Sequence, residues 1–192
     1  MEKGPIEKNA KDPSKTKARI NLERASVLLI DNAWGVELLA RIFLGFGSKH
    51  LYRCCSVAEA TEIIDQHAID LIVSDAMLDD TVAYPFIRSL RLRAEKDPNR
   101  FVPVILLSAH TASRKVTEAR DCGANFFVAK PISPKVIMER IRWVAAAKRK
   151  YLETDSYAGP DRRFRDDGPP EGMVGRRRGD AKNDQASDGA AA

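Results

Sequence analysis

The chain has 192 residues, of which 44% are hydrophobic and 31% are charged. This composition is close to that of globular proteins and excludes a wholly disordered chain. No run of about 18 apolar residues occurs, so we expect no membrane-spanning helix. The N-terminal segment also lacks the apolar core of a secretory signal, and we therefore expect a cytoplasmic protein.

The net charge of +5 is spread along the chain. Residues 1–24 carry seven basic and four acidic side chains (net +3), residues 25–150 carry 18 and 14 (net +4), and residues 151–192 carry seven and nine (net −2). A protein that tracks the phosphates of nucleic acid needs a concentrated basic patch. None is indicated, so we do not expect a nucleic-acid partner.

The three cysteines indicate reduced thiols. Cys54 and Cys55 are adjacent, Cys122 has no obvious mate, and no histidine stands at metal-ligand spacing from a cysteine pair. This usage is typical of a reducing compartment and predicts neither a disulfide nor a zinc site.

The apolar residues are concentrated in residues 25–150, which we expect to form one folded domain. Residues 1–24 form a lysine-rich arm with few large apolar side chains, and residues 151–192 are rich in Arg, Asp, Gly and Pro. Neither segment can bury enough apolar surface to offset the entropy of ordering it, so both are predicted to be disordered.

Short apolar runs alternate with helical patterns along this domain. A first strand over 26–30 precedes a helix whose apolar stripe includes Leu39 and Phe43, and a second strand over 49–54 precedes a helix that opens with Ser56 and Glu59 as a capping box. The remaining predicted elements are a strand over 71–74, a helix over 84–96, a strand over 102–109, a helix over 112–122, a strand over 125–129 and a helix over 133–150.

Five successive strand–helix units predict an α/β fold with a doubly wound parallel sheet. Right-handed crossovers place helices on both faces of such a sheet. Its ligand then lies beyond the carboxyl ends of the strands. The residues at those ends are therefore the candidates for function.

Polar side chains stand at four of these strand ends: Asp31, Asp75, Ser108 and Lys130. Two carboxylates beside an ammonium group suit a site that holds a divalent cation together with a phosphoryl group. The carboxylates provide the oxygen ligands of a hard cation. The hydroxyl and the ammonium can bind phosphoryl oxygens.

The motifs LLIDN, LIVSDAM, VILLSA and GANFFVAKPIS, in this order, resemble the response-regulator receiver family, the CheY-like domains of bacterial two-component signalling. The resemblance covers about residues 25–150. It implies a flavodoxin-like five-stranded sheet with strand order 2-1-3-4-5. It also implies a switch rather than an enzyme, which receives a phosphoryl group from a histidine kinase or phosphotransfer protein. With no effector domain expected after residue 150, output would pass through an unidentified partner protein.

Residue by residue, the resemblance implies that Asp75 is the phosphoacceptor. Asp31 is similar to an acidic Mg²⁺-site residue, and Asp75 and the backbone carbonyl of Met77 are similar to the other ligands. Ser108 matches the hydroxyl that binds the phosphoryl group, and Lys130 matches the lysine that pairs with it.

Two further features follow from the resemblance. The Lys130–Pro131 peptide is expected to be cis, and Phe127 stands where the family has a switch aromatic.

The sequence departs from the family at Asn32, where a second acid is usual, at Asp79, where proline is usual, and at Ala83, where glycine is usual. An amide brings no charge, so we expect weaker Mg²⁺ binding. The alternative is a degenerate receiver that binds a partner without phosphorylation.

Other readings remain open at this stage. Asp31 and Asp75 can serve as helix or turn caps, and Phe127 can be an ordinary core residue. A phosphatase of the haloacid-dehalogenase type, which also uses an aspartate nucleophile, would need a second aspartate where Met77 stands. A nucleic-acid regulator would have to act through the arginines of residues 151–192.

Overall fold

The computed structural model describes residues 22–78, 81–109, 118, 121–146, 150–154 and 157–161. The arm expected over residues 1–24 lies almost wholly outside these ranges. Residues 162–192, Asp79 and most of the helix expected over 112–122 lie outside them as well.

Five parallel strands form the central sheet in the order β2-β1-β3-β6-β7. Counted along the chain within this sheet, that order is 2-1-3-4-5, so the predicted doubly wound sheet is confirmed. The strands are β1 (Ser26–Ile30), β2 (His50–Cys54), β3 (Leu71–Asp75), β6 (Val104–Ser108) and β7 (Phe126–Ala129).

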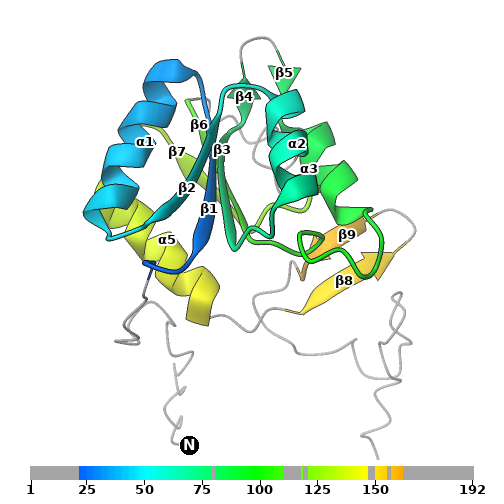
Figure 1. Ribbon diagram of the computed structural model, residues 1–192. Helices are drawn as coiled ribbons and strands as arrows, with labels where there is room; N and C mark the ends of the chain where they lie inside the picture. The colour runs from blue at the N-terminus through cyan, green and yellow to red at the C-terminus, as the bar shows by residue number, and fades with distance from the viewer. Residues whose placement is uncertain are drawn as a thin grey trace, which may run out of the picture.

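Two layers of helices cover the sheet (Figure 1). Helices α1 (Ala33–Gly45) and α5 (Pro134–Ala146) lie on one face, and α2 (Val57–Gln66) and α3 (Tyr84–Arg91) lie on the other. Neighbouring residues of a strand point to opposite faces. Leu28 therefore joins the core with α2 and α3, whereas Leu29 joins the core with α1 and α5.

Polar side chains cap the first turns of α1, α2 and α5. The Asn32 side chain accepts a hydrogen bond from the Gly35 N–H (2.9 Å) at the start of α1. At α2 the Ser56 half of the predicted capping box is confirmed, because Ser56 Oγ accepts from the Glu59 N–H (3.2 Å). The Glu59 carboxylate accepts from the N–H of Cys55 (3.2 Å), one residue before the cap, and not from that of Ser56. Ser133 Oγ accepts from the Val136 N–H (3.3 Å) at α5.

Helix α3 ends at Arg91 and not at Lys96 as expected. Beyond Arg91 the chain continues as a loop that is held by its polar side chains. Arg93 pairs with Asp97, and the buried Asn99 amide donates to the carbonyls of Ile64 and His67, both at 2.8 Å. The loop is thereby fastened to the end of α2.

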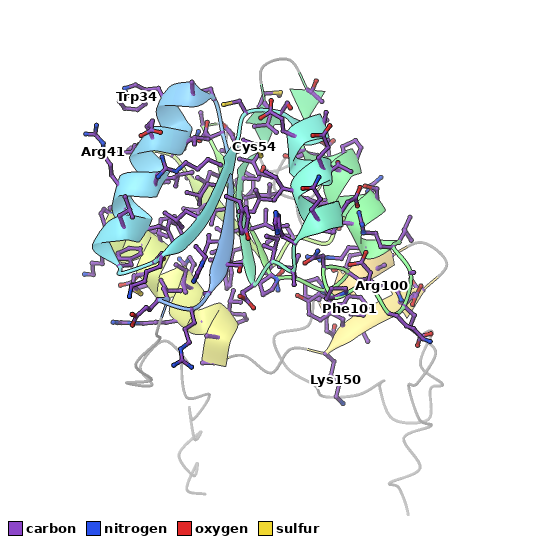
Figure 2. All side chains as sticks on the ribbon, in the orientation of Figure 1. Trp34, Arg41, Cys54, Arg100, Phe101 and Lys150 are labelled. Atoms are coloured by element: carbon purple, nitrogen blue, oxygen red, sulfur yellow. The ribbon has the colours of Figure 1, made fainter. Side chains whose placement is uncertain are left out.

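A C-terminal β-hairpin corrects the expectation of a disordered tail from residue 151 onward. Strands β8 (Tyr151–Thr154) and β9 (Tyr157–Pro160) pair antiparallel beside the end of α3 (Figure 1). Long-range contacts order this polar segment. The Tyr151 ring packs against Phe101 (centroids 4.7 Å apart) and lies beneath the buried Arg91 guanidinium, and Arg100 pairs with Glu153 at 2.6 Å. Figure 2 shows Arg100 and Phe101 beside this hairpin.

A glycine lets the hairpin approach the sheet closely. Gly123 has φ +95°, a conformation that side chains disfavour, and a Cβ there would lie 2.7 Å from the Ala158 carbonyl oxygen. The hairpin backbone thus occupies the space beside Gly123, just before β7 begins.

Candidate functional site

The four candidate residues lie at one edge of the sheet. Asp31 directly follows β1, Asp75 ends β3, Ser108 ends β6 and Lys130 directly follows β7. Because these strands are parallel neighbours, their carboxyl ends meet at the edge that carries β4 and β5 in Figure 1. This is the edge where the sequence places the ligand site.

The Lys130 ammonium joins the two aspartates. Its Nζ lies 2.9 Å from Asp31 Oδ2 and 2.6 Å from Asp75 Oδ2. The side chain of Asp31 is 2% exposed, that of Asp75 is 13% exposed and that of Lys130 is 26% exposed. The predicted convergence of two carboxylates on one cationic neighbour is therefore present.

Opposing effects act on the pKa of Lys130. Burial lowers the pKa of the ammonium group, but the hydrogen bonds and charges of Asp75 and Asp31 outweigh burial and raise it above the ordinary value of lysine. The ammonium form is thus the stable one at neutral pH, and it compensates one of the two negative charges.

The Asp31 carboxylate has a different partner for each oxygen. Oδ1 accepts a hydrogen bond from the Asn32 N–H at 2.8 Å, and Oδ2 binds Lys130. The Asn32 side chain instead caps α1 through its amide oxygen. Of this pair, Asp31 alone therefore presents its side chain to Lys130.

The Asp75 carboxylate is likewise held at both oxygens. Oδ1 accepts from the Met77 N–H at 3.2 Å, while Oδ2 binds Lys130. Met77 belongs to a short hairpin that the sequence analysis missed, formed by β4 (Met77–Leu78) and β5 (Thr81–Val82). The hairpin is anchored by the buried Ala76, whose N–H donates to the Leu107 carbonyl and whose carbonyl accepts from the Ala83 N–H.

Ser108 and Lys130 are tied together through the backbone. The Lys130 N–H donates to the Ser108 carbonyl at 2.7 Å, so the ends of β6 and β7 are joined beside the carboxylates. The Ser108 side chain is buried.

The expected cis peptide between Lys130 and Pro131 is confirmed. Phe127 is partly buried against the core on the α2 and α3 side, so the structure places it in contact with the core and leaves a switching role as a prediction.

The two carboxylates fit a divalent cation as a pair. Both already converge on one positive group, the Lys130 ammonium, so their oxygens can face a common cation. In the described ranges, no cluster of three or more His, Cys, Asp or Glu side chains could hold a metal ion. A cation here would need backbone or water oxygens in addition, as the expected role of the Met77 carbonyl implies.

Gly35 is a residue of this site that the sequence analysis did not single out. A Cβ at Gly35 would lie 2.3 Å from Asp31 Cγ and 2.5 and 2.6 Å from its two carboxylate oxygens. The available signal was a glycine inside the first helical pattern, where glycine is disfavoured without a packing reason.

None of the helices in the described ranges combines the length and hydropathy that a membrane crossing requires.

A family model described as the response regulator receiver domain matches residues 27–142. The chain is 25% identical over 136 residues to the transcriptional regulatory protein YvrH of Bacillus subtilis. This alignment covers 70% of this chain and 54% of YvrH. The chain thus spans about half the length of this curated relative.

Solved structures show the same fold. The chemotaxis protein CheY4 of Vibrio cholerae superposes with a TM-score of 0.56 at 20% identity, covering 62% of this chain and 96% of CheY4. The receiver domain of the sensor histidine kinase PA1611 of Pseudomonas aeruginosa, which has a magnesium ion in its active-site cleft, superposes with a TM-score of 0.55 at 20% identity, covering 63% and 98% of the two chains. Since the family match spans more than half of the sequence and the fold agrees with it, this chain belongs to the response regulator receiver domain family of two-component systems.

Proposed function

We propose that this protein is a phosphorylatable switch in which Asp75 receives a phosphoryl group from a histidine kinase or a histidine phosphotransfer protein. The observation that carries the proposal is the Lys130 ammonium, held 2.6 Å from Asp75 and 2.9 Å from Asp31. A half-buried cation between two carboxylates is arranged to compensate the charge of an incoming phosphoryl group.

In the proposed reaction, a carboxylate oxygen of Asp75 attacks the phosphorus of a phosphohistidine. A bond forms between oxygen and phosphorus, and the phosphorus–nitrogen bond breaks. Its electron pair stays on the imidazole nitrogen, which then takes up a proton from solvent. The product is an acyl phosphate on Asp75, formed by nucleophilic catalysis of the kind that carboxylates perform elsewhere.

The neighbouring side chains have separate roles in this proposal. Lys130 pairs with a phosphoryl oxygen, and the Ser108 hydroxyl binds another, so that the ends of β6 and β7 respond to the modification. Asp31 and Asp75 would hold Mg²⁺, with the Met77 carbonyl as a further ligand; when bound, Mg²⁺ supplies positive charge to the phosphoryl oxygens. The magnesium in the cleft of the Pseudomonas receiver supports this choice of cation.

The outer face of α1 is the surface we propose for the phosphodonor protein. Trp34 is 77% exposed and Leu38 is 37% exposed, one turn apart and close to the site edge. Figure 2 shows Trp34 at the N-terminal end of α1, with its side chain directed away from the core. Exposed aromatic residues are enriched at protein interfaces. Phosphodonors of this kind imply a cytoplasmic location, which the three cysteines, none of them in a disulfide, support.

The phosphodonor surface is tested with Trp34→Ala. We expect phosphoryl transfer from a phosphorylated partner protein to slow at least tenfold, while modification by a small acyl phosphate keeps its rate. Equal rates with the partner protein for Trp34→Ala and the wild type would refute this surface.

Modification itself is tested by incubating the full chain with Mg²⁺ and acetyl phosphate and weighing the intact protein. The proposal expects an adduct of about 80 Da, which the Asp75→Asn variant does not form.

A phosphorylation-independent binding module is the second candidate function. One observation favours it: the Asn32 side chain, which stands where the family usually has a second acid, is used to cap α1. If the wild-type chain forms no adduct and still binds its partner as tightly as the Asp75→Asn variant does, this second function replaces the first.

A further inference from the structure

Gly35 lies in the first turn of α1, where its lack of a side chain has no local conformational reason. Among the described glycines, those with positive φ are Gly47, Gly123 and Gly159, and Gly35 is not one of them. Glycine inside a helix is less favourable than alanine. A reason for glycine at this position must therefore come from a neighbour.

That neighbour is the Asp31 carboxylate. A Cβ on Gly35 would lie 2.3 Å from Asp31 Cγ, and real Cβ atoms do not approach other atoms within 3.0 Å. The contact is specific to this position, since a Cβ on Gly45 in the same helix would meet nothing within 4 Å. The carboxylate occupies the space that any other residue at position 35 would need.

This space fixes which way Asp31 points. Folded back over the first turn of α1, the carboxylate reaches the Asn32 N–H with one oxygen and Lys130 with the other. The side chain is almost wholly buried, so it has little freedom to turn elsewhere. A methyl group at position 35 would displace the carboxylate and break at least one of these two contacts.

We propose that Gly35 is a positioning residue for the Asp31 carboxylate and thereby sets the affinity of the site for a divalent cation. Any effect of Gly35 on phosphoryl transfer rests on the proposed function. The contact between Gly35 and Asp31 itself does not depend on that function.

The test is a double-mutant cycle on the full chain with Gly35→Ala, Asp31→Ala and the double variant, and with Gly45→Ala as the matched control. Mg²⁺ titrations followed by tryptophan fluorescence give a midpoint for each protein, and thermal melts give a melting temperature. In the Asp31→Ala background the carboxylate is gone, so the second alanine has room.

We expect Gly35→Ala to raise the Mg²⁺ midpoint at least fivefold and to lower the melting temperature in the wild-type background. Asp31→Ala lacks one of the proposed Mg²⁺ ligands and should itself bind Mg²⁺ more weakly. Adding Gly35→Ala to it should raise the midpoint no further and should not lower the melting temperature, because alanine is the better helix former. Gly45→Ala should match the wild type in its Mg²⁺ midpoint.

Three results would overturn the proposal: a wild-type midpoint in Gly35→Ala, the same loss in both backgrounds, or a wild-type chain that shows no Mg²⁺ midpoint at all. Failure of the proposed function is distinguishable. A wild-type chain that binds Mg²⁺ and shows the expected cycle, but forms no acyl phosphate, would refute phosphoryl transfer and leave the role of Gly35 intact.

Discussion

Replacing Lys130 by methionine tests the charge balance of the site. The variant keeps a long apolar side chain but leaves two carboxylates without their common cation, and these are 2% and 13% exposed. Removing one partner of a buried ion pair costs about 3–5 kcal/mol of unfolding free energy. Because the Lys130 side chain is 26% exposed, water screens part of the interaction, and we expect about 3 kcal/mol.

For a domain of this size, a loss of about 3 kcal/mol lowers the melting temperature by on the order of 10 °C. The assay is urea unfolding at neutral pH together with a thermal melt. Lys135→Met is the matched control, since Lys135 is exposed on α5. The double variant Lys130→Met with Asp75→Asn should recover part of the loss, because one unpaired charge is removed.

The same variant gives a pH dependence with a definite sign. The pKa of Lys130 is raised in the folded protein, so its contribution to stability is fully present below the ordinary lysine value of 10.5 and is lost as the pH rises beyond it. The stability difference between the wild type and Lys130→Met should therefore shrink above pH 10.5. A variant as stable as the wild type at neutral pH, or a loss equal to that of Lys135→Met, would refute the reasoning.

Two further predictions concern other parts of the domain. Burial raises the pKa of Cys54 to about 12 and that of Cys122 to about 11, whereas Cys55 is exposed. Brief alkylation at pH 8 should therefore label Cys55 first, and equal labelling of all three thiols would contradict the described packing. Tyr151→Ala should lower the free energy of unfolding by about 2 kcal/mol, because it removes the ring that packs on Phe101 and Arg91. Tyr151→Phe removes only the hydrogen bonds to Asn125 and should lower it by less than about 1 kcal/mol. Urea unfolding measures both, and an unchanged stability in Tyr151→Ala would show that the hairpin contributes nothing to the fold.

The sheet and its functional edge could be predicted because they depend on local patterns. Continuous apolar runs such as those of β1 and β6 are typical of strands covered on both faces, and parallel strands bring their carboxyl ends to one edge. Asp31, Asp75 and Lys130 therefore converge although 99 positions separate the first from the last.

The C-terminal hairpin could not be predicted, because its order comes from distant partners. Tyr151 is one aromatic residue in a polar segment, and its stabilising contacts are with Phe101, Asn125 and the buried Arg91, which lie far from it in the sequence. The Arg91 guanidinium donates to the carbonyls of Gly123, Arg100 and Val102, a set that no local pattern reveals.

Local reasoning also missed two details that shape the site around Asp31 and Asp75. From the sequence, Asn32 stands where the family usually has a second acid, whereas in the structure its side chain caps α1. Gly35 matters through a contact with Asp31 that only the three-dimensional course of the chain creates. In both cases the role of the residue depends on its neighbours in the folded chain, which local sequence patterns do not reveal.

The most direct test of the central claim is the mass of the intact protein after exposure to acetyl phosphate and Mg²⁺, compared among the wild type, Asp75→Asn and the exposed-site control Asp70→Asn. The account predicts an increase of about 80 Da in the wild type and in Asp70→Asn and none in Asp75→Asn. Peptide mapping should place the modification on Asp75. An unmodified wild type, or an adduct that persists in Asp75→Asn, would contradict it.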